Sequence, residues 1–266
     1  VVDDVPAIVK VTDSSQQTAD EDDLAGGSDT TSSDSTVLTG GFEVVDGADK
    51  IVSYQVSDLN SVVSGLTSNG QNIELNLVST VGGVTSYEAV ITGTSTKIFT
   101  LSLNANNDSY QFELLGPIDH DAVQGENNLV IDIPITVTDF DGDTSSSLNL
   151  PITIVDDIPE ITSADALSLD EDDLVNGSQL TNKDSLEATG NFDTVEGADT
   201  VVSYQLDLTS NPIPGVTSGG LSVTLVQTAV SNNNYTYQGQ TPDGNSVFTL
   251  ELNADGSYKF TLKGVL

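Results

Sequence analysis

The chain has 266 residues and carries 41 Asp and Glu against 6 Lys and Arg, a formal net charge of −35. This charge excludes electrostatic binding of nucleic acid or of an anionic membrane surface, and it favours cations as partners. The chain has no Cys, and no apolar stretch is long enough for membrane insertion. Because 36% of the residues are hydrophobic and form short alternating runs, we expect a folded chain.

The first distinctive element is the acidic cluster Asp20-Glu21-Asp22-Asp23. Adjacent carboxylates repel one another unless a counter-ion lies among them, so we interpret Asp20, Asp22 and Asp23 as calcium ligands. The alternative is a solvated turn in which an Asp caps one turn of helix. Further along, Asp49 lies in a Gly-Ala-Asp turn, where it either completes a metal site or only forms the turn.

Short runs of alternating hydrophobicity follow, as is typical of half-buried strands. The clearest runs are residues 73–78, 99–103, 129–137, 148–154 and 221–226. Turn pairs such as Asp46-Gly47 and Gly82-Gly83 separate the runs, and long helical periodicity is absent. Many short strands with regular turns predict an all-β fold made of β-sandwiches.

The sharpest acidic motif is Asp139-Phe140-Asp141-Gly142-Asp143, directly after the predicted strand at 129–137. Alternating Asp residues place carboxylates on one side of a turn, and the Gly permits the bend. Calcium takes about six to eight oxygen ligands, some of them backbone carbonyls. We predict a calcium site with Asp139, Asp141 and Asp143 as ligands; a solvated acidic turn is the alternative.

A junction, Val155-Asp156-Asp157-Ile158-Pro159, comes next, and its Pro stiffens the backbone. We predict that Asp156 and Asp157 bridge two domains through a calcium ion, as in cadherin-like linkers. The alternative is an ordinary polar linker. Magnesium fits these irregular, carboxylate-rich clusters less well, and zinc is disfavoured because the chain has one His and no Cys.

The residues give no case for an enzyme. A Ser–His–Asp site would have only His120, which lies between Asp119 and Asp121 and is expected at the surface or in a turn. No nucleophile elbow and no phosphate-binding loop are present. Trp is absent, and we expect Tyr54 and Tyr204 to pack in a core rather than to form a sugar-binding platform.

The chain repeats itself at a spacing of 149 to 153 residues. The matching blocks are Asp3-Asp4-Val5-Pro6 with Asp156-Asp157-Ile158-Pro159, residues 20–24 with 170–174, 47–55 with 197–205, and 99–105 with 248–254. This period is that of a whole domain, so we predict domains at residues 1–153 and 154–266. The repeat adds further candidate calcium ligands: Asp170, Asp172, Asp173 and Asp199.

The second repeat is shorter than the first. Gly264 aligns with Gly116, so residues 117–153, with two predicted strands, have no counterpart. The chain begins at Val1 without Met. We therefore expect a fragment or a processed piece whose second domain is truncated, with a split domain as one explanation.

These motifs together resemble the stalk (extender) repeats of RTX adhesins exported by type I secretion. The resemblance covers essentially the whole chain and rests on the repeated blocks, the loop at 139–143, the segment 252–258 and the Asp-Asp-Xaa-Pro junctions. It implies tandem immunoglobulin-like (cadherin-like) β-sandwich domains that are extracellular and calcium-dependent. The implied partners are calcium ions, neighbouring repeats of the same chain and an inserted ligand-binding domain. The glycine-rich nonapeptide repeats of RTX toxins are absent.

We therefore expect a non-enzymatic, calcium-stabilised extender at the bacterial cell surface, which projects adhesive domains for cell attachment or biofilm formation. A module that binds sugar, peptide or another copy is the first alternative, and a contiguous exposed apolar patch would favour it. A calcium-dependent hydrolase is the second, and a deep cleft with paired carboxylates would favour that.

Overall fold

The computed structural model describes residues 4–12, 17–28, 36–121, 125–179, 181 and 184–266. Strands account for 51% of the described residues and helix for 4%, and the curled antiparallel sheets are consistent with β-sandwich domains, which confirms the predicted fold class. Asp3, in the first Asp-Asp-Xaa-Pro motif, lies outside the described residues. No helix in the part of the chain that is described is long and apolar enough to cross a membrane.

The chain divides into two compact units. Unit 1 comprises Val1–Ile158 and Glu196–Thr200, and unit 2 comprises Pro159–Val195 and Val201–Leu266. The division thus falls after Ile158, a few residues past the end of the first sequence repeat. Strand pairing explains part of this shift, because the last strand of unit 1 continues to Val155.

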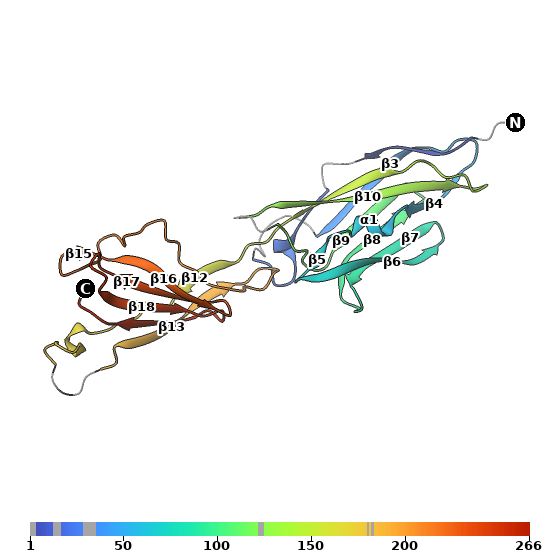
Figure 1. The fold of residues 1–266 in the computed structure, drawn as a ribbon. Coiled ribbons are helices and arrows are strands. Elements are labelled where there is room, and N and C mark those ends of the chain that lie inside the picture. The colour runs from blue at the N-terminus through green and yellow to red at the C-terminus, as the bar shows by residue number, and fades with distance from the viewer. Residues whose placement is uncertain (1–3, 13–16, 29–35, 122–124, 180, 182–183) are drawn as a thin grey trace. The chain divides into compact units, whose positions relative to one another are not determined.

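Unit 1 contains a larger sheet of order β1-β3-β9-β8-β7-β6-β5 and a smaller sheet of order β2-β11-β10-β4 (Figure 1). Its elements are β1 (Ala7–Thr12), β2 (Thr18–Asp20), η2 (Glu21–Asp23), β3 (Val37–Val45), β4 (Ile51–Val56), α1 (Leu59–Val62), β5 (Thr67–Ser68), β6 (Gln71–Val81), β7 (Val84–Ile91), β8 (Lys97–Asn104), β9 (Ser109–Leu114), β10 (Asn128–Asp139) and β11 (Leu148–Val155). The helices are single turns. Neighbouring strands are antiparallel, except that β2 runs parallel to β11.

One continuous core fills the space between these two sheets. Every second residue of β10 from Ile131 to Val137 is buried, as the alternation predicted, and packs in one cluster with Phe99 and Phe112 of the larger sheet. Tyr54 on β4 is also wholly buried, and its hydroxyl donates to Asp108 Oδ1 at 2.8 Å. The expectation that Tyr54 packs in the core is therefore confirmed.

Unit 2 contains a sheet of order β12-β13-β19-β18-β17-β16 and the small pair β14-β15 (Figure 1). Its elements are β12 (Glu160–Ala164), η3 (Glu171–Asp173), β13 (Glu187–Val195), β14 (Thr217–Ser218), β15 (Leu221–Ser222), β16 (Thr224–Ser231), β17 (Asn234–Gln240), β18 (Ser246–Leu252) and β19 (Ser257–Leu262). The order β1-β3-β9-β8-β7-β6 of the larger sheet thus recurs in unit 2 as β12-β13-β19-β18-β17-β16, while β14, the counterpart of β5, lies in the separate pair with β15. The described residues of unit 2 form no counterpart of the smaller sheet.

One predicted strand of unit 2 is interrupted. The run at 221–226 is divided between β15 and β16 at Val223, so the prediction of one continuous strand was wrong. The reason is that the backbone of Val223 bonds to a loop instead: its N–H donates to Val216 O and its carbonyl accepts from the N–H of Ile213. Val223 is nevertheless buried, which is why its hydrophobicity fitted the alternating pattern.

Candidate metal centres

Two groups of metal-ligating side chains stand out among the described residues. In each, ligand atoms from three side chains lie within 4.8 Å of one another: Asp139 with Asp141 and Asp143, and Glu21 with His120 and Asp156. Both belong to unit 1 and lie at opposite ends of β10, a strand of 12 residues. At the usual rise per residue, β10 separates them by roughly 35–40 Å, so they are independent sites.

The first group is built by a loop that closes on itself after β10. The N–H of Asp139 donates to Asp143 O at 3.1 Å, and Asp139 Oδ1 accepts from the N–H groups of Gly142 at 3.1 Å and Asp143 at 2.9 Å. Gly142 has a φ of +106°, which glycine adopts readily and other residues do not. These local bonds bring together the three carboxylates that the sequence predicted as ligands.

Asp139 is the buried member of this loop. It is 1% exposed, and its Oδ2 has no hydrogen-bond partner. A carboxylate oxygen buried without a donor is costly, and a bound cation would remove that cost. Asp141 is exposed and Asp143 is half-buried, which leaves the ion position open to water on one side. Calcium binding at this loop stays a prediction.

The repeated acidic clusters form helix caps. Asp20 accepts a hydrogen bond from the N–H of Asp22 at 3.3 Å before η2, and Asp170 accepts one from Asp172 at 3.1 Å before η3. The capped turn that we considered as the alternative is therefore present in both repeats. Capping does not exclude a metal, so calcium ligation by these acids stays a prediction: Asp20, Asp22, Asp23, Asp170, Asp172 and Asp173.

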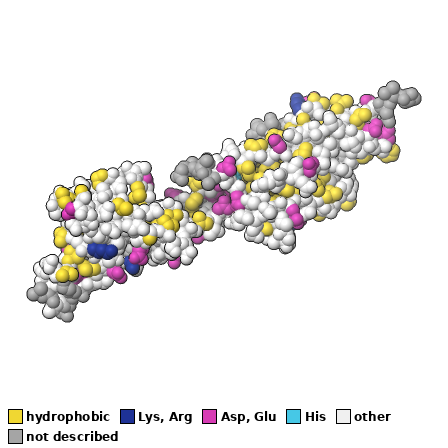
Figure 2. Space-filling model, viewed as in Figure 1, with side chains coloured by type: hydrophobic (Ala, Val, Ile, Leu, Met, Phe, Trp, Pro, Cys, Tyr) yellow, Lys and Arg dark blue, Asp and Glu magenta, His cyan; other side chains and the backbone are white. Residues whose placement is uncertain are grey.

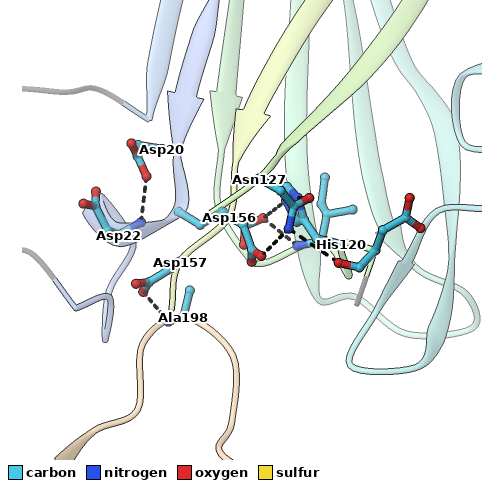
Figure 3. Close-up of polar contacts among 10 residues, drawn as sticks. Asp20, Asp22, His120, Asn127, Asp156, Asp157 and Ala198 are labelled. Atoms are coloured by element: carbon cyan, nitrogen blue, oxygen red, sulfur yellow. Dashed lines mark hydrogen bonds and ion pairs between the residues drawn. The ribbon is translucent and has the colours of Figure 1, made fainter. Parts of the chain in front are cut away.

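Asp157 is held by donors of the protein itself. Its buried carboxylate accepts from the N–H of Ser28 at 3.0 Å and from the Ser28 hydroxyl. It also accepts from the N–H of Ala198 at 2.7 Å (Figure 3). Ala198 belongs to the segment Glu196–Thr200 of unit 1. The structure therefore gives Asp157 a role as a hydrogen-bond acceptor, while Asp156 beside it joins the second metal-ligating group.

Asp49 and Asp199 are half-buried and belong to neither group.

The second group forms where strands of the smaller sheet end. Asp20 at the end of β2 pairs with Val155 at the end of β11, which places Glu21 beside Asp156. Asn128 at the start of β10 also pairs with Val155, so Asn127 lies at the same edge. His120 comes from the segment after β9 and points toward Asn127 and Asp156 (Figure 3). Strand register, rather than sequence proximity, assembles this group.

Glu21 and His120 face each other inside the protein. Glu21 Oε1 accepts from the N–H of Ile118 at 2.8 Å and lies 3.7 Å from His120 Nε2. Burial raises the pKa of the Glu21 carboxyl, against the lowering influence of His120 and of the Ile118 N–H. Burial lowers the pKa of His120, but Glu21, Asn127 and the charge of Asp156 together outweigh it, so the net shift of the pKa is upward.

His120, which was expected at the surface or in a turn, lies in the segment between β9 and β10, but its side chain is buried rather than at the surface. Its side chain is 2% exposed and that of Glu21 is 0% exposed. Polar partners make this burial possible, because His120 contacts both Glu21 and Asn127. The sequence held only a weak signal for this pair: Glu21 lies within an acidic cluster, and His120 is the single His of the chain.

The model of a protein family described as a domain of unknown function, DUF5801, matches residues 10–150, more than half of the chain. The chain belongs to the DUF5801 family. No curated protein and no solved structure matches it. The part matched to DUF5801 runs from β1 into β11 and contains the whole Asp139–Asp143 loop, Glu21 and His120, while Asp156 lies just beyond it. The DUF5801 description assigns no function, so function must be argued from the geometry.

Proposed function

We propose that this DUF5801 chain is a calcium-stabilised structural extender of a large, secreted bacterial surface adhesin. The observation that carries the proposal is the Asp139–Asp143 loop, where a buried carboxylate oxygen without a hydrogen-bond donor lies beside two further carboxylates. Oxygen-only ligands and one solvent-facing side are what calcium accommodates. The sequence repeat, at the spacing of a whole domain, supports the spacer role, since such arrays gain length by adding units.

The overall charge supports the same function. Acidic side chains are spread over the face shown in Figure 2, where Lys and Arg are few, in keeping with the net charge of −35. Self-repulsion of this size keeps a chain soluble and opposes its compaction where divalent ions are scarce. Outside the cell, calcium would neutralise the carboxylates and favour the folded state, because metal binding and folding are coupled.

Thermal melting in calcium and in chelator tests the proposal. One site held at tenfold its Kd stabilises the folded state by about 1.4 kcal/mol. We expect Tm to rise by about 3–6 °C in calcium, by the usual relation for domains of this size. Asp139→Asn should abolish most of the rise, whereas Asp132→Asn, an exposed acid on the same strand, should keep it. Identical melting of the unsubstituted chain with calcium and with chelator would contradict the proposal.

A self-associating module is the second candidate, and one surface of unit 2 favours it. A groove there is lined by Leu167, Leu169, Phe260, Leu262 and Leu266, with Glu171 at its side. Exposed apolar surface of this kind is common at protein contacts. Sedimentation velocity over a wide concentration range decides between the candidates: an extender stays monomeric, whereas self-association shifts with concentration and is weakened by Phe260→Ser.

A further inference from the structure

The buried pair of Glu21 and His120 is incomplete as it stands. Neither Glu21 Oε2 nor His120 Nε2 has a hydrogen-bond partner, although both side chains are essentially inaccessible to solvent. Buried polar atoms are almost always satisfied, so each exception calls for an explanation. Here two such atoms belong to side chains that face each other, next to a third potential ligand, Asp156.

Neighbouring hydrogen bonds determine which nitrogen of His120 carries a proton. The amide of Asn127 donates from Nδ2 to Asp156 Oδ2 at 2.8 Å, which turns Asn127 Oδ1 toward His120 Nδ1 at 3.2 Å. Because an amide oxygen only accepts, Nδ1–H must be the donor. In the neutral ring, Nε2 then presents its lone pair to the Glu21 carboxylate, and two electron-rich atoms face each other without a cation.

A proton shared between His120 and Glu21 does not account well for the distance between their facing atoms. A charge-assisted N–H···O bond is about 2.7–2.9 Å long, whereas His120 Nε2 and Glu21 Oε1 are 3.7 Å apart. A tetrahedral zinc ion with bonds of about 2.0–2.2 Å holds adjacent ligand atoms about 3.3 Å apart. The spacing in unit 1 is therefore closer to that of two ligands on one metal than to that of a hydrogen bond.

We propose that Glu21, His120 and Asp156 bind a divalent transition-metal ion of the zinc class, at a site distinct from the Asp139–Asp143 loop. One imidazole nitrogen with two carboxylates is a donor set for zinc or manganese, whereas calcium takes oxygen ligands. Asn127 completes the arrangement: metal-binding His residues commonly donate their other N–H to an oxygen acceptor, which fixes the ring. The strand ends of the smaller sheet hold Glu21, Asn127 and Asp156 together without the metal, and Asn127 holds His120 beside them.

The single His makes a selective test possible. His120 is the only imidazole in the chain and there is no Cys, so in a chain without an affinity tag the ring ¹⁵N spectrum reports this site alone. We expect zinc, added to calcium-saturated protein, to bind at one equivalent and to shift the Nε2 resonance while Nδ1 stays protonated. An imidazolium spectrum that persists at saturating zinc would overturn the proposal, and this measurement needs no variant.

Matched variants separate this site from the calcium loop. His120→Gln should weaken zinc binding at least 100-fold by calorimetry and leave the calcium-dependent rise in Tm intact. Asn127→Ala should weaken zinc binding about 10-fold, because only the support of the ligand is lost. Asp139→Asn should leave zinc binding intact and abolish most of the calcium-dependent rise in Tm. Equal zinc affinity in His120→Gln and the unsubstituted chain would overturn the proposal, as would displacement of zinc by an equimolar amount of calcium. Loss of the calcium effect alone would count against the proposed function only.

Discussion

Residues 51–56 and 201–206 have almost the same sequence, Ile-Val-Ser-Tyr-Gln-Val and Val-Val-Ser-Tyr-Gln-Leu, but only the first segment is a strand. In both units the segment bonds to the larger sheet in the same way: Val56 N–H donates to Tyr87 Oη at 2.9 Å, and Leu206 N–H donates to Tyr237 Oη at 3.1 Å. The two segments differ in whether a neighbouring strand is present to form backbone hydrogen bonds with them. β4 pairs with β10, and the described residues of unit 2 contain no counterpart of β10.

β2 also forms only where it has a partner strand. In unit 1, Thr18–Asp20 pairs with β11, while the equivalent residues 168–170 are not a strand. Yet the helix cap that follows is present in both units, since it needs only neighbouring residues. Strands at the edge of a sheet thus depend on a partner far away in the sequence, whereas caps and turns depend on local chemistry.

The described residues of unit 2 form no smaller sheet, and this changes the core of unit 2 as well. Phe112 in unit 1 is wholly buried between the two sheets, while its counterpart in unit 2, Phe260, is half-buried and lines the apolar groove. The buried apolar residues of unit 2 form two small clusters instead of one continuous core. We therefore expect unit 2 to be the less stable unit.

The largest expected effect comes from truncating these matched aromatic residues. Phe112→Ala should destabilise unit 1 by about 3–5 kcal/mol, because it leaves a cavity in a closed core. Phe260→Ala should cost unit 2 about 1–2 kcal/mol, since this ring is half-exposed and stacks mainly on Phe248. Urea unfolding, followed by hydrogen exchange on peptides from each unit, measures both values. Equal losses would show that unit 2 closes its core as fully as unit 1 does.

The second expected effect comes from adding a copy of β10 and β11 to unit 2. A copy of residues 119–155 joined after Leu266 should pair with residues 201–206 and turn them into a strand. We expect the amide of Tyr204 to become about 100-fold more protected from hydrogen exchange, because local protection follows local stability. The control is the same extension with its residues in scrambled order. No gain over this control would mean that residues 201–206 are irregular for a reason other than the missing partner.

Much of the fold could be predicted from the sequence. The alternating runs became β6, β8, β10 and β11, and the Gly82-Gly83 turn connects β6 to β7 with both glycines at positive φ. These features follow from local pattern and turn chemistry. The pairings of β2 and β4 could not be predicted, because parallel or edge pairing leaves no local signature.

The candidate sites divide in the same way. Asp139, Asp141 and Asp143 could be predicted to lie together, because the backbone of one short loop brings them there. Glu21 and His120 are 99 positions apart, and only the register of β2, β10 and β11 brings their neighbourhoods together. Asp157 was predicted as a bridging ligand, but donors that belong to distant loops engage its carboxylate.

The third prediction is that calcium stabilises unit 1 more than unit 2. Calcium should increase hydrogen-exchange protection of β10 and β11 by an amount equivalent to about 1.4 kcal/mol at tenfold Kd, and should change β18 and β19 much less. The reason is that the Asp139–Asp143 loop follows β10 directly, while the described residues of unit 2 contain no equivalent group of three ligands. Asp141→Asn should remove this difference. Equal stabilisation of both units by calcium would mean that the repeated acidic clusters bind it too.

The smallest expected effect tests those clusters directly. If Asp20 and Asp170 act only as helix caps, replacing either with Ala should cost about 0.5–1 kcal/mol, and replacing either with Asn should cost almost nothing, because Asn caps as well as Asp. Neither loss should depend on calcium. If Asp20 is instead a calcium ligand, Asp20→Asn will destabilise unit 1 only when calcium is present. Denaturation of the Asn and Ala variants, with calcium and with chelator, therefore distinguishes the two roles. A calcium-dependent loss for Asp20→Asn that is absent for Asp170→Asn would also show that the two repeats have diverged in function, although both keep the cap.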